Sequence, residues 1–329
     1  MRYVDRAYDE SAGDFGRLWD FLVRDYADRD GRVDWMVGRL ADWKYNLATE
    51  RKLSPLFTSK SAHLWLDHRG ELRAFAINED LRHRITVLVQ AGFEHAYPMA
   101  LDWAVDAWST YASPWNPDAG AASEDAVAAW RRLVIVAGEW AARETEVLAS
   151  RGWQDLGLEA VTRRFDVATK AAEPYTIPDG YRLVSMAGDP NIASKVRLHH
   201  DAWHPGTPVT ALDLDIWEYC LTAPTYDPEL DISIVAPDGE HVAGCTAFPD
   251  YVNSNSEIER VCSRSDHRRR GLVQAAIHGC FQALDRAGLR TATITGESDA
   301  AIDLYGKLGA TEEWAWHAWQ LVIRAPTRA

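Results

Sequence analysis

The sequence predicts a mixed α/β protein, with mixed sheets, made of two tandem domains that share one plan. Its 329 residues exceed one average domain and leave room for two of roughly 150 to 180 residues. Strand-like and helix-like segments follow in a similar order on either side of an aperiodic stretch with two prolines, residues 169–180. Residues 148–153 also resemble residues 305–310, which indicates a duplication. We therefore expect domains at 1–168 and 181–329, joined by a linker over 169–180.

Hydrophobic periodicity defines the elements expected in the second half. The clearest is a helix over residues 272–287, because apolar residues recur in it at helical spacing. Gly288 follows directly and favours the end of the helix there. The other helices are expected at residues 192–203, 212–221 and 300–308. Short alternating or apolar runs predict strands at residues 181–186, 232–236, 242–248, 257–263, 291–295 and 313–323.

The first half has a comparable element order. We expect helices at residues 15–25, 97–110 and 139–150, and strands at residues 63–67, 72–77, 85–90, 133–137 and 160–165. One segment differs between the halves in chemistry. Residues 91–98 of the first half contain no arginine, whereas the corresponding segment of the second half contains four. The first domain is therefore expected to be a degenerate copy that binds no pyrophosphate.

The arginine-rich segment is residues 264–271, which contains no apolar side chain. It lies where an expected strand turns into the N-terminus of the helix at 272–287. Backbone N–H groups without intrahelical partners and the helix dipole attract an anion at such a position. Gly271 allows close approach of the backbone, and guanidinium groups match phosphate oxygens. These features predict a pyrophosphate cradle; the alternative is a solvated basic turn.

Composition limits the function classes. The chain has 35 basic and 49 acidic residues, a formal net charge of −14, so a single basic loop favours a small anionic ligand over nucleic acid. No apolar run of about 18 residues and no signal segment is apparent, which predicts a cytoplasmic protein with no membrane partner. The four cysteines are widely spaced and are expected to be reduced and buried. The adjacent pair His199 and His200 lacks metal-ligand spacing, so a surface pair and no metal site is expected.

Two motifs carry a family resemblance. Residues 268–273, Arg-Arg-Arg-Gly-Leu-Val, resemble the Arg/Gln-x-x-Gly-x-Gly/Ala signature of the GNAT superfamily of acyl-CoA-dependent N-acyltransferases. Residues 298–310, Ser-Asp-Ala-Ala-Ile-Asp-Leu-Tyr-Gly-Lys-Leu-Gly-Ala, resemble its Asn-x-x-Ala-x-x-Leu-Tyr-x-x-x-Gly-Phe signature. The two occur in the expected order about 30 residues apart, and the resemblance extends over residues 231–322. The plan of two domains resembles tandem members of the family such as mycothiol synthase.

Three positions depart from the signatures. Val273 replaces a small residue, Ser298 replaces Asn, and Ala310 replaces an aromatic residue. These changes bear on the affinity for the cofactor more than on the fold. The backbone N–H of Val273 can still donate to an anion.

The resemblance implies acetyl-CoA as the acyl donor. It implies that the cradle binds the pyrophosphate, that the stretch from Val261 pairs with the pantetheine arm as an added strand does, and that N–H groups around Cys262 and Ser263 polarise the thioester carbonyl. The implied cofactor-binding residues are Val261, Cys262, Ser263, Arg268, Arg269, Arg270, Gly271, Leu272, Val273, Ser298 and Ala301.

The resemblance also implies two catalytic residues. An amine with a pKa near 10.4 is neutral in only about one molecule in 10³ at pH 7, so acyl transfer benefits from a base. Glu257 and Glu259 alternate with Ile258, so both glutamates point to the same face of the strand before the cradle. We choose Glu259 as the base. The alternative for either residue is an ion pair with a neighbouring arginine. Tyr305 corresponds to the tyrosine that protonates the departing thiolate; Leu148 is its counterpart in the first half.

These expectations combine into an N-acetyltransferase that moves an acetyl group from acetyl-CoA to a primary amine of a small molecule. Direct attack is expected, because no cysteine or serine lies in a nucleophile motif. Residues 203–206 and 217–219 are candidates for acceptor selection, with Asp213 and Asp215 able to attract a cation; packing and solvated charge is the alternative. Other possible functions are a non-catalytic acyl-CoA sensor or scaffold and a peptide or protein N-acetyltransferase.

Overall fold

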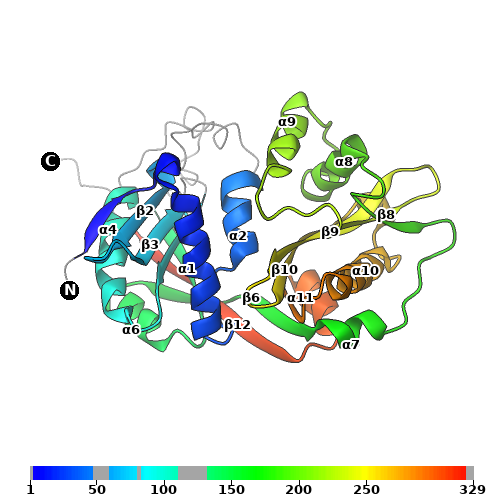
Figure 1. The fold of residues 1–329 in the computed structure, drawn as a ribbon. Coiled ribbons are helices and arrows are strands. Elements are labelled where there is room, and N and C mark those ends of the chain that lie inside the picture. Colours follow the sequence, from blue (N-terminus) through cyan, green and yellow to red (C-terminus); the bar gives the residue numbers. More distant parts are fainter. Residues whose placement is uncertain (1–2, 47–58, 80–82, 110–131, 324–329) are drawn as a thin grey trace. The chain divides into compact units, whose positions relative to one another are not determined.

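The computed structural model describes residues 3–46, 59–79, 83–109 and 132–323 (Figure 1). The chain forms two compact units, and neither is a continuous stretch of sequence. Unit 1 comprises Met1–Asp34, Arg51–Ala160 and Trp314–Ala329, whereas unit 2 comprises Trp35–Glu50 and Val161–Glu313. Both are mixed α/β units, as the sequence predicts.

The segment expected to be a linker, residues 169–180, belongs to unit 2. It begins inside helix α7 (Val167–Ala172), which packs on helix α10 (Leu272–Arg286). Tyr175 and Ile177 then pack against the hydrophobic core of the unit. Prolines made the segment look like a linker, but apolar contacts distant in sequence hold it in place.

The sheet of unit 2 has a single parallel pair. Strands β7 (Arg182–Ser185), β8 (Asp231–Val235), β9 (His241–Asp250) and β10 (Asn255–Ser263) follow one another as antiparallel neighbours. Strand β11 (Thr291–Gly296) then lies parallel to β10 and antiparallel to residues 161–166 of β6 (Gln154–Asp166). Helix α10 connects the parallel pair, as a parallel crossover requires.

Helices cover both faces of this sheet (Figure 1). One face carries α7, α10 and α11 (Asp299–Gly306), whereas the other carries α8 (Ile192–Trp203) and α9 (Ala211–Cys220). The second face also carries α2 (Val37–Ala41), which packs on β9 and β10, and the π-helical turn η2 (Asp42–Asn46), which packs on α9. Gly279 of α10 faces Leu183 of β7 so closely that any larger residue would overlap it.

Unit 1 repeats the plan. Strands β1 (Val4–Ala7), β2 (Ala62–Leu66), β3 (Leu72–Asn78) and β4 (Ile85–Val89) are antiparallel neighbours. A parallel bridge between Arg84 and Val134 then places β5 (Arg132–Gly138) beside β4. Helix α1 (Asp14–Asp28) packs on β3, α4 (Tyr97–Ser109) packs on β3 and β4, and α6 (Ala142–Ser150) follows β5. The last residue of the helix expected at 97–110 lies outside the described residues.

Each unit receives a strand from the end of the other half of the sequence. Residues 161–166 of β6 pair with β11 in unit 2, whereas β12 (Glu312–Val322) pairs with β5 in unit 1. Trp319 and Leu321 of β12 pack against the core of unit 1. The strands expected at 160–165 and 313–323 therefore exist, but each completes a sheet other than that of its own half.

The four cysteines are free and buried, as predicted. Among the described residues, no helix has the length and apolar character needed to cross a bilayer.

A buried ion pair ties α8 to the sheet of unit 2. Lys195 Nζ lies 2.6 Å from Asp231 Oδ1, and both side chains are fully buried. Lys195 also donates to Ser233 Oγ at 2.9 Å. Asp231 accepts from Tyr226 Oη at 3.0 Å and from Thr246 Oγ1 at 3.1 Å. Removal of one charge would leave the other buried and unpaired.

We expect Lys195→Met to lower the free energy of unfolding by about 3–5 kcal/mol, because it leaves the Asp231 carboxylate uncompensated. The double variant Lys195→Met/Asp231→Asn keeps hydrogen-bonding groups for Tyr226 and Thr246 and should recover part of this loss. Urea unfolding followed by circular dichroism measures both. A single variant as stable as the double variant would contradict the prediction.

Candidate active site

Strands β10 and β11 separate early, which opens one edge of β10. Their parallel ladder joins Asn255–Glu257 to Thr291–Thr293, although β10 runs on to Ser263. Beyond Glu257 the strand remains paired with β9 on its other side. The predicted residues Val261, Cys262 and Ser263 lie in this separated part. An extended guest can add to such an edge through main-chain hydrogen bonds.

An irregularity in β10 changes the direction of its side chains. The register with β9 shifts between Glu259 and Cys262, and Arg260 has a φ of 52°. Regular alternation would send neighbouring side chains to opposite faces. Ile258 enters the core under α10, whereas Arg260 binds Asp42 of η2 on the opposite face. The bulge therefore allows Glu259 and Arg260 to serve the same face of the sheet.

Glu257 and Glu259 form a coupled carboxyl pair on that face. Glu257 is buried against Gly38 of α2, and its Oε2 accepts a hydrogen bond of 2.9 Å from the backbone N–H of Arg39. Burial raises the pKa of Glu257 to about 7. Burial and then the charge of Glu257 raise the pKa of Glu259 well above its ordinary value. The charge of each carboxyl group disfavours ionisation of the other, so the two titrate as a pair.

Tyr305 lies close to this pair. It is a buried residue of α11, in the same apolar cluster as Val273. Burial and then the charge of Glu259 raise the pKa of its phenol, which therefore stays protonated. Within the described part of the chain, the Tyr305 hydroxyl has no hydrogen-bond partner. Glu259 is therefore near enough for its charge to act on the Tyr305 phenol, as is Cys262.

The N-terminus of α10 has the features expected of an anion site. Gly271 precedes the helix with a φ of 77°, and a Cβ added to it would meet open space. The backbone N–H groups of residues 268–274 donate to no acceptor among the residues that the structure describes. These N–H groups lie at the positive end of the dipole of a 15-residue helix. Both the N–H groups and the dipole favour an anion at this end.

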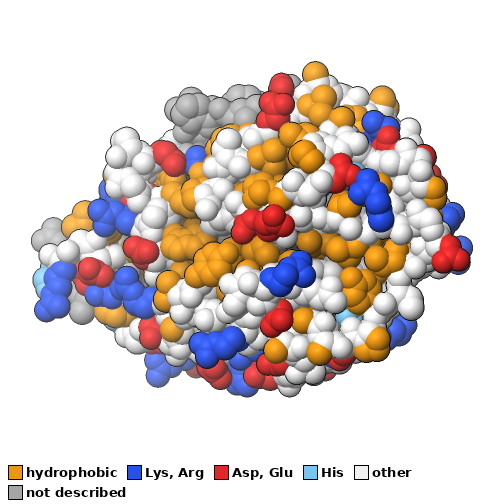
Figure 2. Space-filling model, turned by 45° about the vertical axis from the view of Figure 1, so that its right-hand side comes forward, with side chains coloured by type: hydrophobic (Ala, Val, Ile, Leu, Met, Phe, Trp, Pro, Cys, Tyr) orange, Lys and Arg blue, Asp and Glu red, His pale blue; other side chains and the backbone are white. Residues whose placement is uncertain are grey.

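The arginines beside these amides carry charge without a carboxylate partner. Arg268 donates to the carbonyl of Ala202 at 3.3 Å, and Arg270 donates to the hydroxyl of Tyr181 at 2.9 Å. Arg268, Arg269 and Arg270 are exposed, and none belongs to an ion pair within the described ranges. Figure 2 shows basic and acidic side chains interspersed over the face in view, so the basic side chains there form no continuous surface.

The corresponding segment of unit 1 is closed by the protein's own acceptors. The N–H of Gly92 donates to Glu94 Oε1 at 2.8 Å, and the N–H of Ala91 donates to Asp25 Oδ1 at 3.3 Å. Backbone carbonyls accept from Phe93, Ala96 and Tyr97. Carboxylates at this position would repel a phosphate, which agrees with the prediction that the first half binds no pyrophosphate.

Two predicted cofactor residues are hydrogen-bonded to each other. Ser298 is the N-cap of α11, and its Oγ accepts the N–H of Ala301 at 3.3 Å. The serine that replaces the signature Asn therefore caps the helix. This bond already uses the Ala301 amide.

The acceptor candidates on α8 and α9 differ in environment. Trp203 is 55% exposed, whereas Trp217 is buried. Asp213 forms a reciprocal capping box with Thr210, so this carboxylate serves the start of α9, whereas Asp215 is exposed. The expected surface pair is wrong for His199, which is half-buried and packs against Trp203 and Trp217. No cluster of metal-ligating side chains occurs within residues 3–46, 59–79, 83–109 and 132–323.

Sequence reasoning missed the segment that covers the carboxyl pair. Helix α2 and turn η2 supply Gly38, Arg39 and Asp42 to the site from the N-terminal part of the chain. The apolar residues Met36, Leu40 and Trp43 are buried and recur at helical spacing. That spacing was the available signal.

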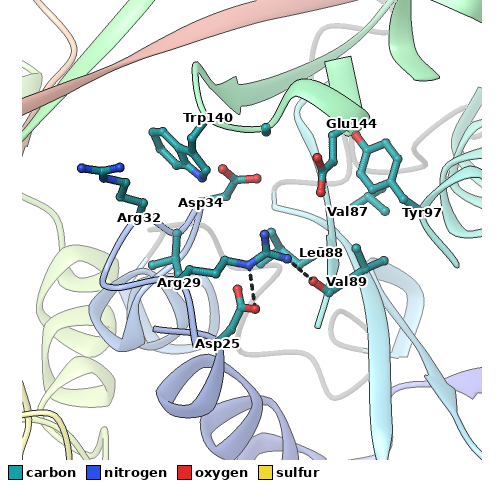
Figure 3. A pocket seen from close by; sticks show the side chains of 12 residues that line it. Asp25, Arg29, Arg32, Asp34, Val87, Leu88, Val89, Tyr97, Trp140 and Glu144 are labelled. Atoms are coloured by element: carbon teal, nitrogen blue, oxygen red, sulfur yellow. Dashed lines mark hydrogen bonds and ion pairs between the residues drawn. The ribbon is translucent and has the colours of Figure 1, made fainter. Parts of the chain in front are cut away.

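A pocket, which sequence reasoning also missed, lies in unit 1 (Figure 3). It is partly open to solvent and lies between α1, β4 and the N-termini of α4 and α6. Arg29 bridges Asp25 at 2.8 Å and the carbonyl of Val89 at 2.9 Å. Burial and then the charge of Glu144 raise the pKa of Asp34 to about 7. Asp25 and Arg29 pair with each other, whereas Asp34 Oδ1 is buried with no hydrogen-bond partner among the described residues.

Comparisons with known proteins agree with this geometry. Residues 196–310 match the family model of the Acetyltransferase (GNAT) family. A search of curated proteins found no match. A GCN5-related N-acetyltransferase from Sphaerobacter thermophilus has 16% identity and a TM-score of 0.58, over 96% of this chain and 95% of its own. A tandem GNAT protein from the clavulanic acid biosynthesis pathway has 12% identity and a TM-score of 0.58, over 99% and 100%.

The similarity in fold extends over nearly the whole chain, whereas the similarity in sequence is to residues 196–310. The resemblance to mycothiol synthase in particular stays a prediction. The chain has the two-domain fold of tandem GNAT proteins, and its residues 196–310 carry the sequence pattern of the GNAT acetyltransferase family.

Proposed function

We propose that unit 2 binds acetyl-CoA and transfers its acetyl group to a primary amine of a small molecule. The observation that carries this proposal is the row of backbone N–H groups at residues 268–274 without acceptors in the described chain, beside three arginines without carboxylate partners. Main-chain donors at a helix N-terminus together with guanidinium groups suit a diphosphate. The match of residues 196–310 to the GNAT family supports the same ligand.

The remaining predicted residues would hold the rest of the donor. The separated edge of β10 at Val261–Ser263 suits the pantetheine arm, because an extended chain can continue the sheet there. The amides around Cys262 would donate to the thioester carbonyl oxygen. Acetyl-CoA supplies the activated acetyl group. A tandem GNAT protein of similar fold is described in a form without AcCoA, so this compound is named in connection with that protein.

Glu259 and Tyr305 would divide the proton transfers between them. Ionised Glu259 accepts a proton from the amine, and its raised pKa makes it a stronger base than an ordinary carboxylate. The amine nitrogen bonds to the acetyl carbon, and the carbon–sulfur bond breaks. Tyr305, whose phenol stays protonated, donates a proton to the departing sulfur. No covalent enzyme intermediate is needed, so the mechanism is direct attack.

Acetyl-CoA binding tests the cradle. We expect the double variant Arg268→Ala/Arg270→Ala to weaken acetyl-CoA binding by about tenfold or more, because it removes charge-assisted donors. Isothermal titration calorimetry measures the affinity. Arg286→Ala, at the opposite end of α10 and also exposed, is the matched control and should bind normally. Equal affinity of the wild type and the double variant would defeat the proposal.

Tyr305→Phe should lower the rate of acetyl transfer by about a hundredfold, because it removes the proton donor to sulfur. Its affinity for acetyl-CoA should be retained. Thiol release in the presence of an amine panel measures turnover, and Tyr251→Phe, an exposed tyrosine, is the control. Binding without turnover in the wild type would instead indicate the non-catalytic sensor. Turnover of peptides alone would indicate the peptide N-acetyltransferase.

The rate of acetyl transfer should rise with pH through neutrality, because the base acts when ionised and burial raises the pKa of both carboxyl groups. Glu257→Gln removes a charge that raises the pKa of Glu259, so it should move the acidic limb to lower pH. The pH profile of kcat/KM at saturating acetyl-CoA tests this. Asp285→Asn, an exposed carboxylate at the end of α10, should leave the limb in place. If the acidic limb of the pH profile stays in place in Glu257→Gln, the charge of Glu257 does not raise the pKa of the base.

A further inference from the structure

Three polar side chains on the α8 and α9 face of unit 2 have atoms that are buried without a partner. These atoms are Arg260 Nη1, Trp217 Nε1 and His199 Nε2, and none has a hydrogen-bond partner among the residues described. Arg260 is 5% exposed and Trp217 is 4% exposed. The side chains lie together, since the Arg260 guanidinium is 5.5 Å from the Trp217 ring centroid and the His199 ring is 4.5 Å from it.

Arg260 is held in one orientation that leaves Nη1 unused. Its Nε and Nη2 donate to Asp42 Oδ1 at 3.1 and 2.8 Å, and its guanidinium lies 5.1 Å from the ring of Phe248. The neighbouring charge of Asp42 helps to keep the group protonated. A buried donor without an acceptor costs about 1–3 kcal/mol, and more when it is charged. An acceptor from outside the described residues would remove this cost.

The three atoms can act as donors toward the same kind of group. Guanidinium and indole nitrogens donate and cannot accept. Burial, followed by the charges of Lys195 and Arg260, lowers the pKa of His199 well below its ordinary value, so its ring is neutral and can donate through one nitrogen. A ligand group that only accepts hydrogen bonds fits this set. A carboxylate is such a group, and guanidinium binds it with a charge-assisted hydrogen bond.

We propose that the acceptor of unit 2 is an amino carboxylate, and that its carboxylate binds Arg260 Nη1 and Trp217 Nε1 while its amine faces Glu259. This inference rests on the proposed acetyl transfer. Glu259 and Arg260 are consecutive, so their Cα atoms are about 3.8 Å apart, and the bulge directs both side chains to one face. A compact molecule with both an amine and a carboxylate can therefore reach both residues.

The charge of the surroundings suits a zwitterion better than a simple anion. Asp42 offsets the charge of Arg260, and Glu257 and Glu259 lie on the same face. An acceptor with a carboxylate alone would add negative charge beside these acids. The ammonium group of an amino carboxylate brings a compensating positive charge to the carboxyl pair.

Matched acceptors test the proposal. Histidine and histamine, tryptophan and tryptamine, tyrosine and tyramine, and lysine and cadaverine are pairs that differ in the carboxylate alone. Thiol release from acetyl-CoA gives kcat/KM for each. At least one pair should be turned over, with the carboxylated member preferred by about ten- to a hundredfold, the range of a hydrogen bond to a charged group. Equal rates within every active pair, or a preference for the decarboxylated amines, would overturn the proposal.

Two variants separate recognition from folding. Arg260→Met alone would leave Asp42 buried and uncompensated, so the double variant Arg260→Met/Asp42→Asn is used, with its fold checked by circular dichroism. In this double variant, the ratio of kcat/KM between the carboxylated and decarboxylated members of a pair should fall to about one. The single variant Asp42→Asn keeps Arg260 and should keep the preference. A preference that survives in the folded double variant would show that Arg260 does not read the carboxylate.

A binding measurement decides the matter without turnover. In protein labelled with ¹⁵N-tryptophan, the indole N–H resonance of Trp217 can be assigned through its loss in Trp217→Phe. Carboxylated members of the pairs, and glycine, should shift this resonance, whereas their decarboxylated partners, and methylamine, should not. If no carboxylated compound shifts it, the proposal is overturned. Failure of acetyl-CoA to bind in calorimetry would instead overturn the proposed function, so the two failures are distinguishable.

Discussion

The candidate site depends on one constraint, the course of strand β10. It leaves β11 after Glu257, and it breaks its alternation between Glu259 and Cys262. The first event frees a strand edge, and the second places a carboxyl and a guanidinium from consecutive residues on one face. A left-handed Gly271 then turns the chain into α10 and exposes its first amides. Irregular backbone within nine residues of strand and the turn that follows thus creates the open strand edge and the row of amides, whereas α2, η2 and α11 supply residues around them.

The two units differ in what satisfies the amides at the corresponding helix N-terminus. In unit 2 the helix N-terminus has free amides and unpaired arginines, whereas in unit 1 Glu94 and Asp25 accept the corresponding amides. A carboxylate within the protein stabilises a helix N-terminus as a bound anion does, and it requires no ligand. In unit 1 these amides are therefore satisfied within the protein itself. The acidic pocket of unit 1 near Asp34 lies among the same elements, β4 and the starts of α4 and α6.

Local signals in the sequence predicted much of this arrangement. The arginine run with Gly271, and the helical spacing after it, predicted the helix and its exposed first amides, because their physical causes lie within a few residues. Tyr305 was predicted from a signature motif and Glu259 from its place on the strand before the cradle, and the charge of Glu259 acts on the Tyr305 phenol in the structure. Two other features depend on contacts distant in sequence. Arg39 meets Glu257 across 218 positions, and alternation could not predict the direction of Arg260, since a bulge reverses it. Prolines near Tyr175 also suggested a linker, but Tyr175 packs against the hydrophobic core of unit 2.

The strand exchange between the halves has a consequence for biosynthesis. Unit 1 needs β12, which the ribosome makes after nearly all of unit 2, and unit 2 needs the end of β6, which is made before most of it. Unit 1 therefore cannot complete its sheet while the chain is still emerging, and β5 must wait with an unsatisfied edge. Expression of either half by itself would expose that edge permanently. Selection should consequently keep the two halves on one polypeptide.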